Sequence, residues 1–290
     1  MEPIISRFLG YMTDEKGASP HTTWAYRNDL SQFLDFLHGQ RSSTFGWESV
    51  TLSEVSGFIG QLQNRGSSEA TMARKVAAIK SFFAFLQAKG IIRLNPVEKF
   101  KSPHVGKSLP RSLSLREINE LLGQPVHRRT PEDLRNRAMV EILYATGMRV
   151  SELISLDQDD IWEDGSLALI CCRGGRKERS IPIHQRVFRI LQDYVDRARP
   201  RLTHNRNEKA LFLNRYGERL TRQGVWISLK GYAEVAGIKT PVTPQTLRHS
   251  FAAHMLRDGV PIQSVQRLLG HANLSSTKIY RLHIDEVGRV

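Results

Sequence analysis

The sequence predicts a mainly α protein of two domains that carries a small antiparallel β-sheet, an α+β fold. Three observations support this class. The chain has 290 residues, more than most single domains contain. Apolar residues recur at helical spacing along most of the chain. The pattern changes to that of short strands only between residues 166 and 183.

Residues 1–100 predict a small helical bundle. Ser19 and Pro20 have the residue types of an N-cap and a first helical position, and apolar residues follow at helical spacing. Thr51 and Glu54 form a capping box before a second helix, and a third runs to Gly90. The other face of this third helix carries three cations that we expect to contact a polyanion: Arg74, Lys75 and Lys80.

Residues 101–113 predict a linker with an unusual excess of positive charge. Prolines break the helical pattern here, as a solvated hinge between domains would require. A hinge does not explain the charge, whereas a linker that crosses a phosphate backbone explains both features. Its expected contacts are Lys101, Lys107 and Arg111.

Residues 114–290 predict a second domain of mixed structure. A capping box formed by Ser114 and Glu117 opens its first helix. Residues 166–172 and 179–183 read as two strands joined by a glycine-containing turn, and residues 210–213 are a candidate third strand. The remaining segments return to helical spacing.

The composition favours a polyanionic partner. Lys and Arg number 42 against 29 Asp and Glu, a formal net charge of +13, although a basic protein without such a partner is the alternative. No apolar run is long enough to span a membrane, and the N-terminus lacks a signal peptide pattern, so we expect a cytoplasmic protein. Two adjacent cysteines, Cys171 and Cys172, predict neither a disulfide framework nor a metal site.

Two arginines stand at positions where an anion is expected. Arg248, in the stretch TPQTLRHSFAAHM, lies beside an apolar helical stripe, so its guanidinium needs an anionic partner, either a protein carboxylate or a phosphate. Arg149, in ATGMRVSEL, follows Gly147 at a helix–turn–helix junction. Downstream, LLGHANLSSTKIY contains Gly270 and His271, expected at a helix start, and then Tyr280.

These stretches, in this order, resemble the tyrosine recombinases of the phage-integrase family, and most closely the Xer type. The stretch SPHTTWAYRNDLSQFLDFL is similar to the family's core-binding, SAM-like domain. RKERSIPI and the three stretches around the two arginines and Tyr280 resemble successive catalytic boxes. The resemblance implies an N-terminal core-binding domain and a C-terminal catalytic domain.

The resemblance also implies a reaction and its residues. Tyr280 would attack a DNA phosphodiester and form a 3′-phosphotyrosyl link, with Arg149, Arg248 and His271 binding the phosphate. No metal and no cofactor would be required. The partners would be double-stranded DNA and three further protomers, in a homotetramer or in a heterotetramer with a second recombinase. Strands would be exchanged through a Holliday junction, in the cytoplasm at the nucleoid.

Two departures from the family pattern bear on activity. Gly174 occupies the position of the usual hairpin lysine, which leaves Lys177 as either a shifted acid or a contact to the DNA backbone. Gln245 replaces the usual histidine three residues before Arg248. Glu152 is either a surface carboxylate or the group that orients Arg149. Further DNA contacts are expected from the hairpin arginines Arg173, Arg176 and Arg179.

Rival functions remain open at this point. The two departures favour a protein of the same fold that binds DNA as an architectural or regulatory factor with little or no cleavage. A type IB topoisomerase would use the same nucleophile chemistry, although the helical first domain and the Xer-like boxes argue against it.

Overall fold

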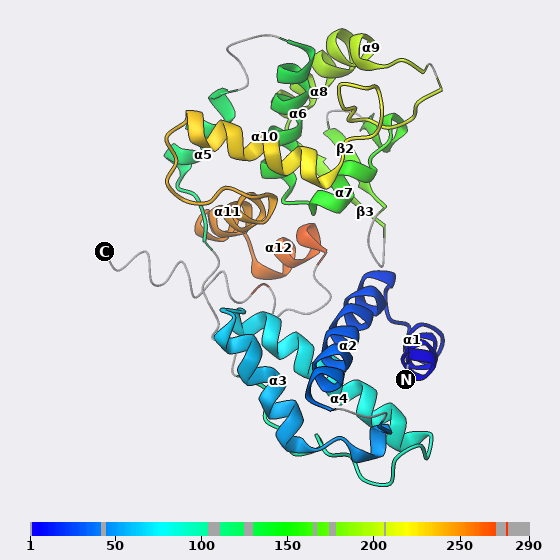
Figure 1. The fold of residues 1–290 in the computed structure, drawn as a ribbon. Coiled ribbons are helices and arrows are strands. Elements are labelled where there is room, and N and C mark those ends of the chain that lie inside the picture. Colours follow the sequence, from blue (N-terminus) through cyan, green and yellow to red (C-terminus); the bar gives the residue numbers. More distant parts are fainter. Residues whose placement is uncertain are drawn as a thin grey trace, which may run out of the picture. The chain divides into compact units, whose positions relative to one another are not determined.

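The computed structural model describes residues 2–41, 45–103, 111–124, 130–164, 167–173, 178–205, 207–270 and 277. The chain divides into two compact units, Met1–Lys107 and Ser108–Val290 (Figure 1). The predicted fold class is confirmed: the described elements are mostly helices, with one three-stranded antiparallel sheet. No helix within these ranges is both long and apolar enough for a membrane span.

The first unit is a helical bundle, two of whose helices begin where the sequence predicts. The Ser19 hydroxyl accepts a hydrogen bond from the backbone N–H of Thr22, and Thr51 and Glu54 form the expected reciprocal capping box. A helix at the N-terminus was not predicted. The helices described in this unit are α1 (Glu2–Asp14), α2 (Pro20–Gln40), α3 (Leu52–Asn64) and α4 (Glu69–Ala88), with a 3₁₀ turn at Trp47–Ser49.

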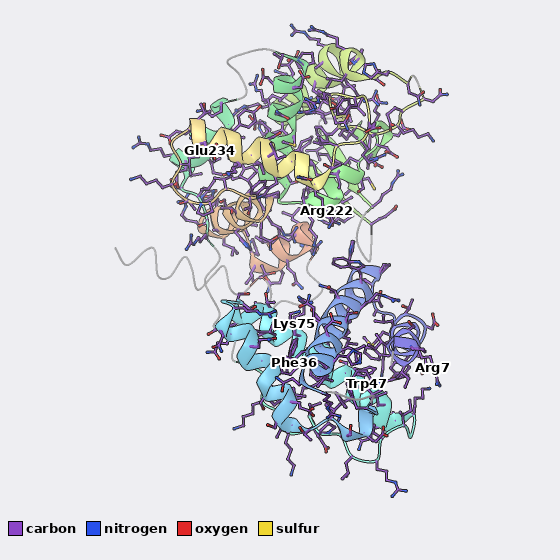
Figure 2. The ribbon with its side chains drawn as sticks, viewed as in Figure 1. Arg7, Phe36, Trp47, Lys75, Arg222 and Glu234 are labelled. Carbon is purple, nitrogen blue, oxygen red and sulfur yellow. The ribbon has the colours of Figure 1, made fainter. Side chains whose placement is uncertain are left out.

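Aromatic side chains fill the core of this bundle. Trp47, labelled in Figure 2, is buried and packs edge-to-face on Phe82 with ring centroids 4.7 Å apart. Phe82 in turn meets Phe8 of α1, which draws the unpredicted helix onto α4. Phe33 of α2 and Phe58 of α3 form a further pair.

The predicted basic face of α4 needs one correction. Lys75, labelled in Figure 2, is only 4% exposed. Its amine donates to the carboxylate of the fully buried Asp29 at 2.9 Å and to Gln32 at 2.8 Å. The prediction of a free surface cation at Lys75 is therefore wrong, because a buried carboxylate on α2 draws the amine inward. Arg74 also pairs with Asp29 but stays exposed, and Lys80 is half-buried.

The second unit wraps helices around a small sheet and a central helix. Helix α6 is buried along most of its length and packs against α8 and α11 (Figure 1). Figure 2 labels Arg222 and Glu234 near opposite ends of α10. The helices are α5 (Leu115–Gly123), α6 (Pro131–Thr146), α7 (Val150–Ser155), α8 (Gln185–Asp193), α9 (Arg199–Leu202), α10 (Arg222–Val235), α11 (Pro244–Arg257) and α12 (Ile262–Leu269), with single turns at Gln158–Asp160 and Tyr194–Ala198.

The sheet has the order β1-β2-β3, with both pairs antiparallel. The two predicted strands are confirmed as β2 (Leu167–Cys172) and β3 (Arg179–Ile183), in a register that places Ile170 opposite Ile181. Strand β1 (Ile161–Asp164) was not predicted.

The expected strand at residues 210–213 does not form, so that prediction is wrong. The segment makes only isolated bridges at its two ends. Three of its four carbonyls accept hydrogen bonds from side chains, and only Phe212 O accepts a backbone N–H, that of Leu220, so no continuous ladder forms. The donors are Arg199 to Ala210 O, Tyr194 to Leu211 O and Arg135 to Leu213 O.

Candidate active site

The junction between α6 and α7 fixes the first arginine of the site. Gly147 ends α6 in the left-handed conformation (φ +59°), and a methyl group there would come within 2.4 Å of the Phe251 ring. Arg149, two residues later, is the N-cap residue of α7. Its side chain remains 42% exposed, so the guanidinium is open to solvent and to a ligand.

Glu152 binds both the backbone and the side chain of Arg149. The Glu152 carboxylate accepts hydrogen bonds from the Arg149 backbone N–H at 2.7 Å and from its Nη1 at 3.2 Å. Glu152 is fully buried, so the interpretation as a surface carboxylate is wrong and the orienting interpretation fits the geometry. Burial disfavours its charge, but hydrogen bonds from Arg179 and Arg149 outweigh that cost and hold the pKa of Glu152 below its usual value.

The second arginine comes from α11. Leu247 and Phe251 of this helix are buried as the sequence predicts, and Arg248 between them is only 5% exposed. Its guanidinium donates from Nη1 to Gly147 O and from Nη2 to Leu269 O, both at 2.6 Å. These acceptors are neutral carbonyl oxygens, which orient the guanidinium without cancelling its charge.

Three arginines converge on the carboxyl end of α12. The last carbonyls of a helix lack intrahelical partners, and the helix dipole favours cations there. Here successive carbonyls bind guanidinium groups from β3, α11 and the start of α7. The pairs are Arg179 Nε with Leu268 O at 2.9 Å, Arg248 Nη2 with Leu269 O at 2.6 Å, and Arg149 Nη2 with Gly270 O at 3.2 Å. The arrangement concentrates positive charge at the point where the chain reaches His271.

Gly270 ends α12, and the helix start expected at His271 falls outside the described residues. Gly270 adopts the left-handed conformation (φ +63°) that closes a helix. Several predicted site residues lie outside the described residues: Lys107, Gly174, Arg176, Lys177, His271 and Tyr280.

The remaining predicted residues differ in how far they are exposed. Arg179 is 14% exposed and binds both oxygens of Glu152, so part of its guanidinium is committed within the protein, and its contact with DNA stays a prediction. Arg173 is exposed but pairs with the buried Asp160 at 2.8 Å. Lys101, Arg111 and Gln245 are exposed. Within the described part of the chain, no cluster of His, Cys, Asp or Glu is placed to hold a metal ion.

The pairing of Glu152 with Arg179 is the part of the site that sequence reasoning missed. The two residues are 27 positions apart and lie on different elements, α7 and β3. The position of Arg179 at the start of a strand gives no indication of a buried partner. The one available signal was Glu152 itself, because a carboxylate that becomes buried needs a cation close by.

The arrangement of a helical bundle followed by an arginine-rich catalytic unit is that of the integrase class of proteins. A family model described as "Phage integrase family" matches residues 111–286, and one described as "Phage integrase, N-terminal SAM-like domain" matches residues 5–90. The chain therefore belongs to the phage integrase family.

The similar relatives are Xer tyrosine recombinases. The chain is 45% identical to tyrosine recombinase XerC of Herpetosiphon aurantiacus, over 97% of this chain and 90% of that protein. It is 40% identical to tyrosine recombinase XerD of Listeria innocua, over 97% and 94%. A crystal structure of the XerH site-specific recombinase in a post-cleavage complex with palindromic difH substrate shares the fold, with a TM-score of 0.76 at 21% identity over 99% of this chain and 94% of that one.

Proposed function

We propose that this chain is a site-specific recombinase that cleaves and rejoins double-stranded DNA. The proposal is carried by the convergence of Arg149, Arg179 and Arg248 on the end of α12, directly before His271 in the sequence. Guanidinium groups suit the charge of a phosphoryl group in a transition state. The names of the relatives and the substrate in the XerH structure support a DNA phosphodiester as that anion.

Tyr280 supplies the nucleophile. Its phenolic oxygen attacks the scissile phosphorus, a 3′-phosphotyrosyl bond forms, and the bond to the 5′ oxygen breaks. Arg149 and Arg248 bind the nonbridging oxygens, on which negative charge accumulates, and His271 donates a further hydrogen bond. The 5′ oxygen leaves as a hydroxyl after it gains a proton. Because the phosphotyrosyl bond conserves the energy of the phosphodiester, rejoining in the reverse direction requires no cofactor.

Recombination requires two DNA sites and four nucleophiles. The protein acts as a tetramer, of this chain alone or with a second recombinase, and exchanges strands in pairs through a Holliday junction. The net charge of +13 supports extensive contact with the phosphate backbone. Arg74, on the exposed surface of the first unit, and Lys101 and Arg111, at the two ends of the basic linker, are the described cations that we assign to this contact. The protein acts in the cytoplasm, at the nucleoid.

A second candidate function is DNA binding with impaired cleavage. Gln245 is exposed on the first turn of α11, where the family pattern has a histidine. Glutamine can donate a hydrogen bond to a phosphoryl oxygen but cannot carry a proton charge. General acid–base assistance is worth about 10²–10⁴-fold. The loss of two such groups, at positions 174 and 245, would leave an architectural protein.

One experiment separates these functions. Genomic DNA fragments bound by the purified protein are sequenced, and the recovered site is then made as a nicked suicide duplex, in which a cleaved strand cannot be rejoined. The proposed recombinase accumulates a covalent adduct with this duplex, and Tyr280→Phe forms none while it binds the duplex with nearly the same affinity. Binding by wild type without any adduct supports the architectural function.

Two further outcomes would redirect the proposal. An adduct formed by Tyr280→Phe would assign the nucleophile to another residue. Relaxation of supercoiled DNA that lacks the recovered site would indicate a type IB topoisomerase.

Affinity for the duplex is expected to fall steeply with salt as condensed cations are displaced, and a flat response would contradict binding through the phosphate backbone.

A further inference from the structure

The carboxylate of Glu152 lies between two guanidinium groups. It accepts four hydrogen bonds, and all four come from arginines: two from Arg149, described above, and two from Arg179. Arg179 binds both oxygens through its guanidinium, with Nη1 at 2.7 Å from Oε1 and Nη2 at 2.9 Å from Oε2, whereas the Arg149 guanidinium reaches only Oε1, at 3.2 Å. Two parallel bonds of this kind are the strongest geometry available to an arginine and a carboxylate.

Exposure differs sharply among the three groups. Glu152 is 0% exposed and Arg179 14%, whereas the Arg149 side chain is 42% exposed. Two positive charges and one negative charge leave a surplus of +1. Because the carboxylate binds Arg179 through both oxygens, this surplus lies on Arg149, the member that solvent and ligands can reach. Without Arg179, the same carboxylate would form a neutral pair with Arg149.

Arg179 also joins three elements. Its backbone begins β3, its Nη atoms bind Glu152 of α7, and its Nε donates to Leu268 O at the end of α12. The Arg179 guanidinium therefore fixes the end of α12 relative to Arg149. Three of its N–H donors are committed to Leu268 and Glu152, and its side chain is 14% exposed against 42% for Arg149.

We propose that Arg179 is a positioning residue whose guanidinium neutralises Glu152, so that Glu152 orients Arg149 without cancelling its charge toward the scissile phosphate. The inference rests on the proposed function, because it assigns the phosphate as the ligand of Arg149. It assigns Arg179 to the support of the site and not to DNA contact.

The test compares wild type with Arg179→Met, which keeps much of the apolar stem and removes the charge. Arg197→Met is the matched control, because Arg197 also binds a carboxylate, Asp193, at 2.7 Å but is 74% exposed. Each protein is assayed at saturating suicide duplex with either a phosphodiester or an uncharged methylphosphonate at the scissile position. On the phosphodiester we expect Arg179→Met to slow adduct formation by roughly 10- to 100-fold, less than the ~10²–10³-fold cost of removing a direct donor.

The methylphosphonate distinguishes electrostatics from misfolding. It carries one negative charge fewer, so Arg149 contributes less to its transition state, and the loss in Arg179→Met is expected to shrink to a few-fold. A damaged fold would slow both substrates alike. Equal losses on the two substrates, or no loss on the phosphodiester, would overturn the proposal.

A second variant keeps the test decisive if Arg179→Met is unstable. In a Glu152→Gln background no carboxylate remains to be neutralised, so adding Arg179→Met is expected to cost much less than it does beside Glu152. Arg179→Lys, which keeps the charge, is expected to retain more activity than Arg179→Met. An equal cost of Arg179→Met in both backgrounds would contradict the proposed role.

The role of Arg179 can also be tested if the protein does not cleave DNA. If wild type forms no adduct, the same comparison is made by equilibrium binding in the Tyr280→Phe background, which requires no cleavage. We expect the parent to prefer the phosphodiester duplex over the methylphosphonate duplex, and Arg179→Met to lose that preference. An unchanged preference would overturn the role of Arg179 whatever the outcome for cleavage.

Discussion

The backbone of Gly270 lies against the guanidinium of Arg179. A methyl group built on Gly270 would stand 2.9 Å from Arg179 Nη1, and the residue has a φ of +63°. Glycine is thus required here for two separate reasons, the left-handed conformation and the close approach of a charged group that also binds Glu152. The backbone geometry at the end of α12 depends on both.

Gly270→Ala is expected to damage the site more than the same change at a comparable helix end. Gly237 has a similar φ of +67° but nothing within 4 Å of an added methyl group, so Gly237→Ala measures the backbone cost alone, about 1–2 kcal/mol. We expect Gly270→Ala to lower the free energy of unfolding by a further ~1 kcal/mol or more, since Arg179 must move. Denaturant unfolding checks this. Equal losses in the free energy of unfolding at the two glycines would show that the Arg179 side chain moves aside without cost.

Removal of Lys75 is expected to destabilise the first unit. Lys75→Met leaves the fully buried Asp29 with Arg74 as its one charged partner among the contacts described here. Breaking a buried pair typically costs about 3–5 kcal/mol, and the remaining arginine should reduce this to about 2–3 kcal/mol. Lys80→Met, on the same helix and less buried, is the control and should change unfolding by less than about 0.5 kcal/mol. A Lys75→Met variant as stable as the control would contradict the importance of the pair.

Local signals in the sequence located most helix starts. The capping residues Ser19, Thr51 and Ser114 all form their predicted hydrogen bonds. A cap requires only contacts three residues apart, so it can be read without knowledge of the fold. Helix α1 escaped prediction because it lacks such a motif and is held by packing of Phe8 on α4.

Features that depend on distant partners were not predictable. Lys75 follows the pattern of a surface cation until Asp29, 46 residues earlier, is placed beside it. The segment at residues 210–213 has strand composition, but arginine and tyrosine side chains donate to three of its four carbonyls. The order of motifs did indicate Arg149 and Arg248 as one site, and the structure brings them to one helix end. The role of Arg179 could be recognised only from the fold, because its partner Glu152 lies 27 residues away in the sequence.

A pH dependence is expected from His254. Its ring Nδ1 lies 2.9 Å from the Tyr144 hydroxyl, and burial, together with the nearby Arg257, holds the pKa of His254 below its usual value of 6.5. The unfolded chain therefore binds this proton more readily than the folded chain. The stabilisation is present above pH 6.5 and is lost as pH falls toward the folded-state pKa. His254→Gln should flatten this part of the stability profile, measured by unfolding between pH 5 and 8; an unchanged slope would assign it to another group.

Under the proposed function, we expect the segment between β2 and β3 to decide how the 5′ oxygen gains its proton. Arg173 pairs with the buried Asp160, and a guanidinium does not give up a proton near neutral pH, so Arg173 cannot serve as the acid. Either Lys177 is the acid that protonates the 5′ oxygen, or no lysine serves as that acid. If Gly174 does occupy the usual lysine position, cleavage of an ordinary phosphodiester is slow and Gly174→Lys should accelerate it, less so if that glycine has a positive φ.

A substrate with sulfur at the bridging 5′ position decides between these cases, because a thiolate leaves without protonation. If no acid is present, wild type should cleave the sulfur substrate far faster than the oxygen substrate, and Lys177→Ala should change neither rate by much. If Lys177 is the acid, Lys177→Ala should slow the oxygen substrate by about 10²–10⁴-fold and leave the sulfur substrate nearly unaffected. Equal rates of wild type on the two substrates, unchanged by either mutation, would mean that proton transfer to the leaving group does not limit cleavage.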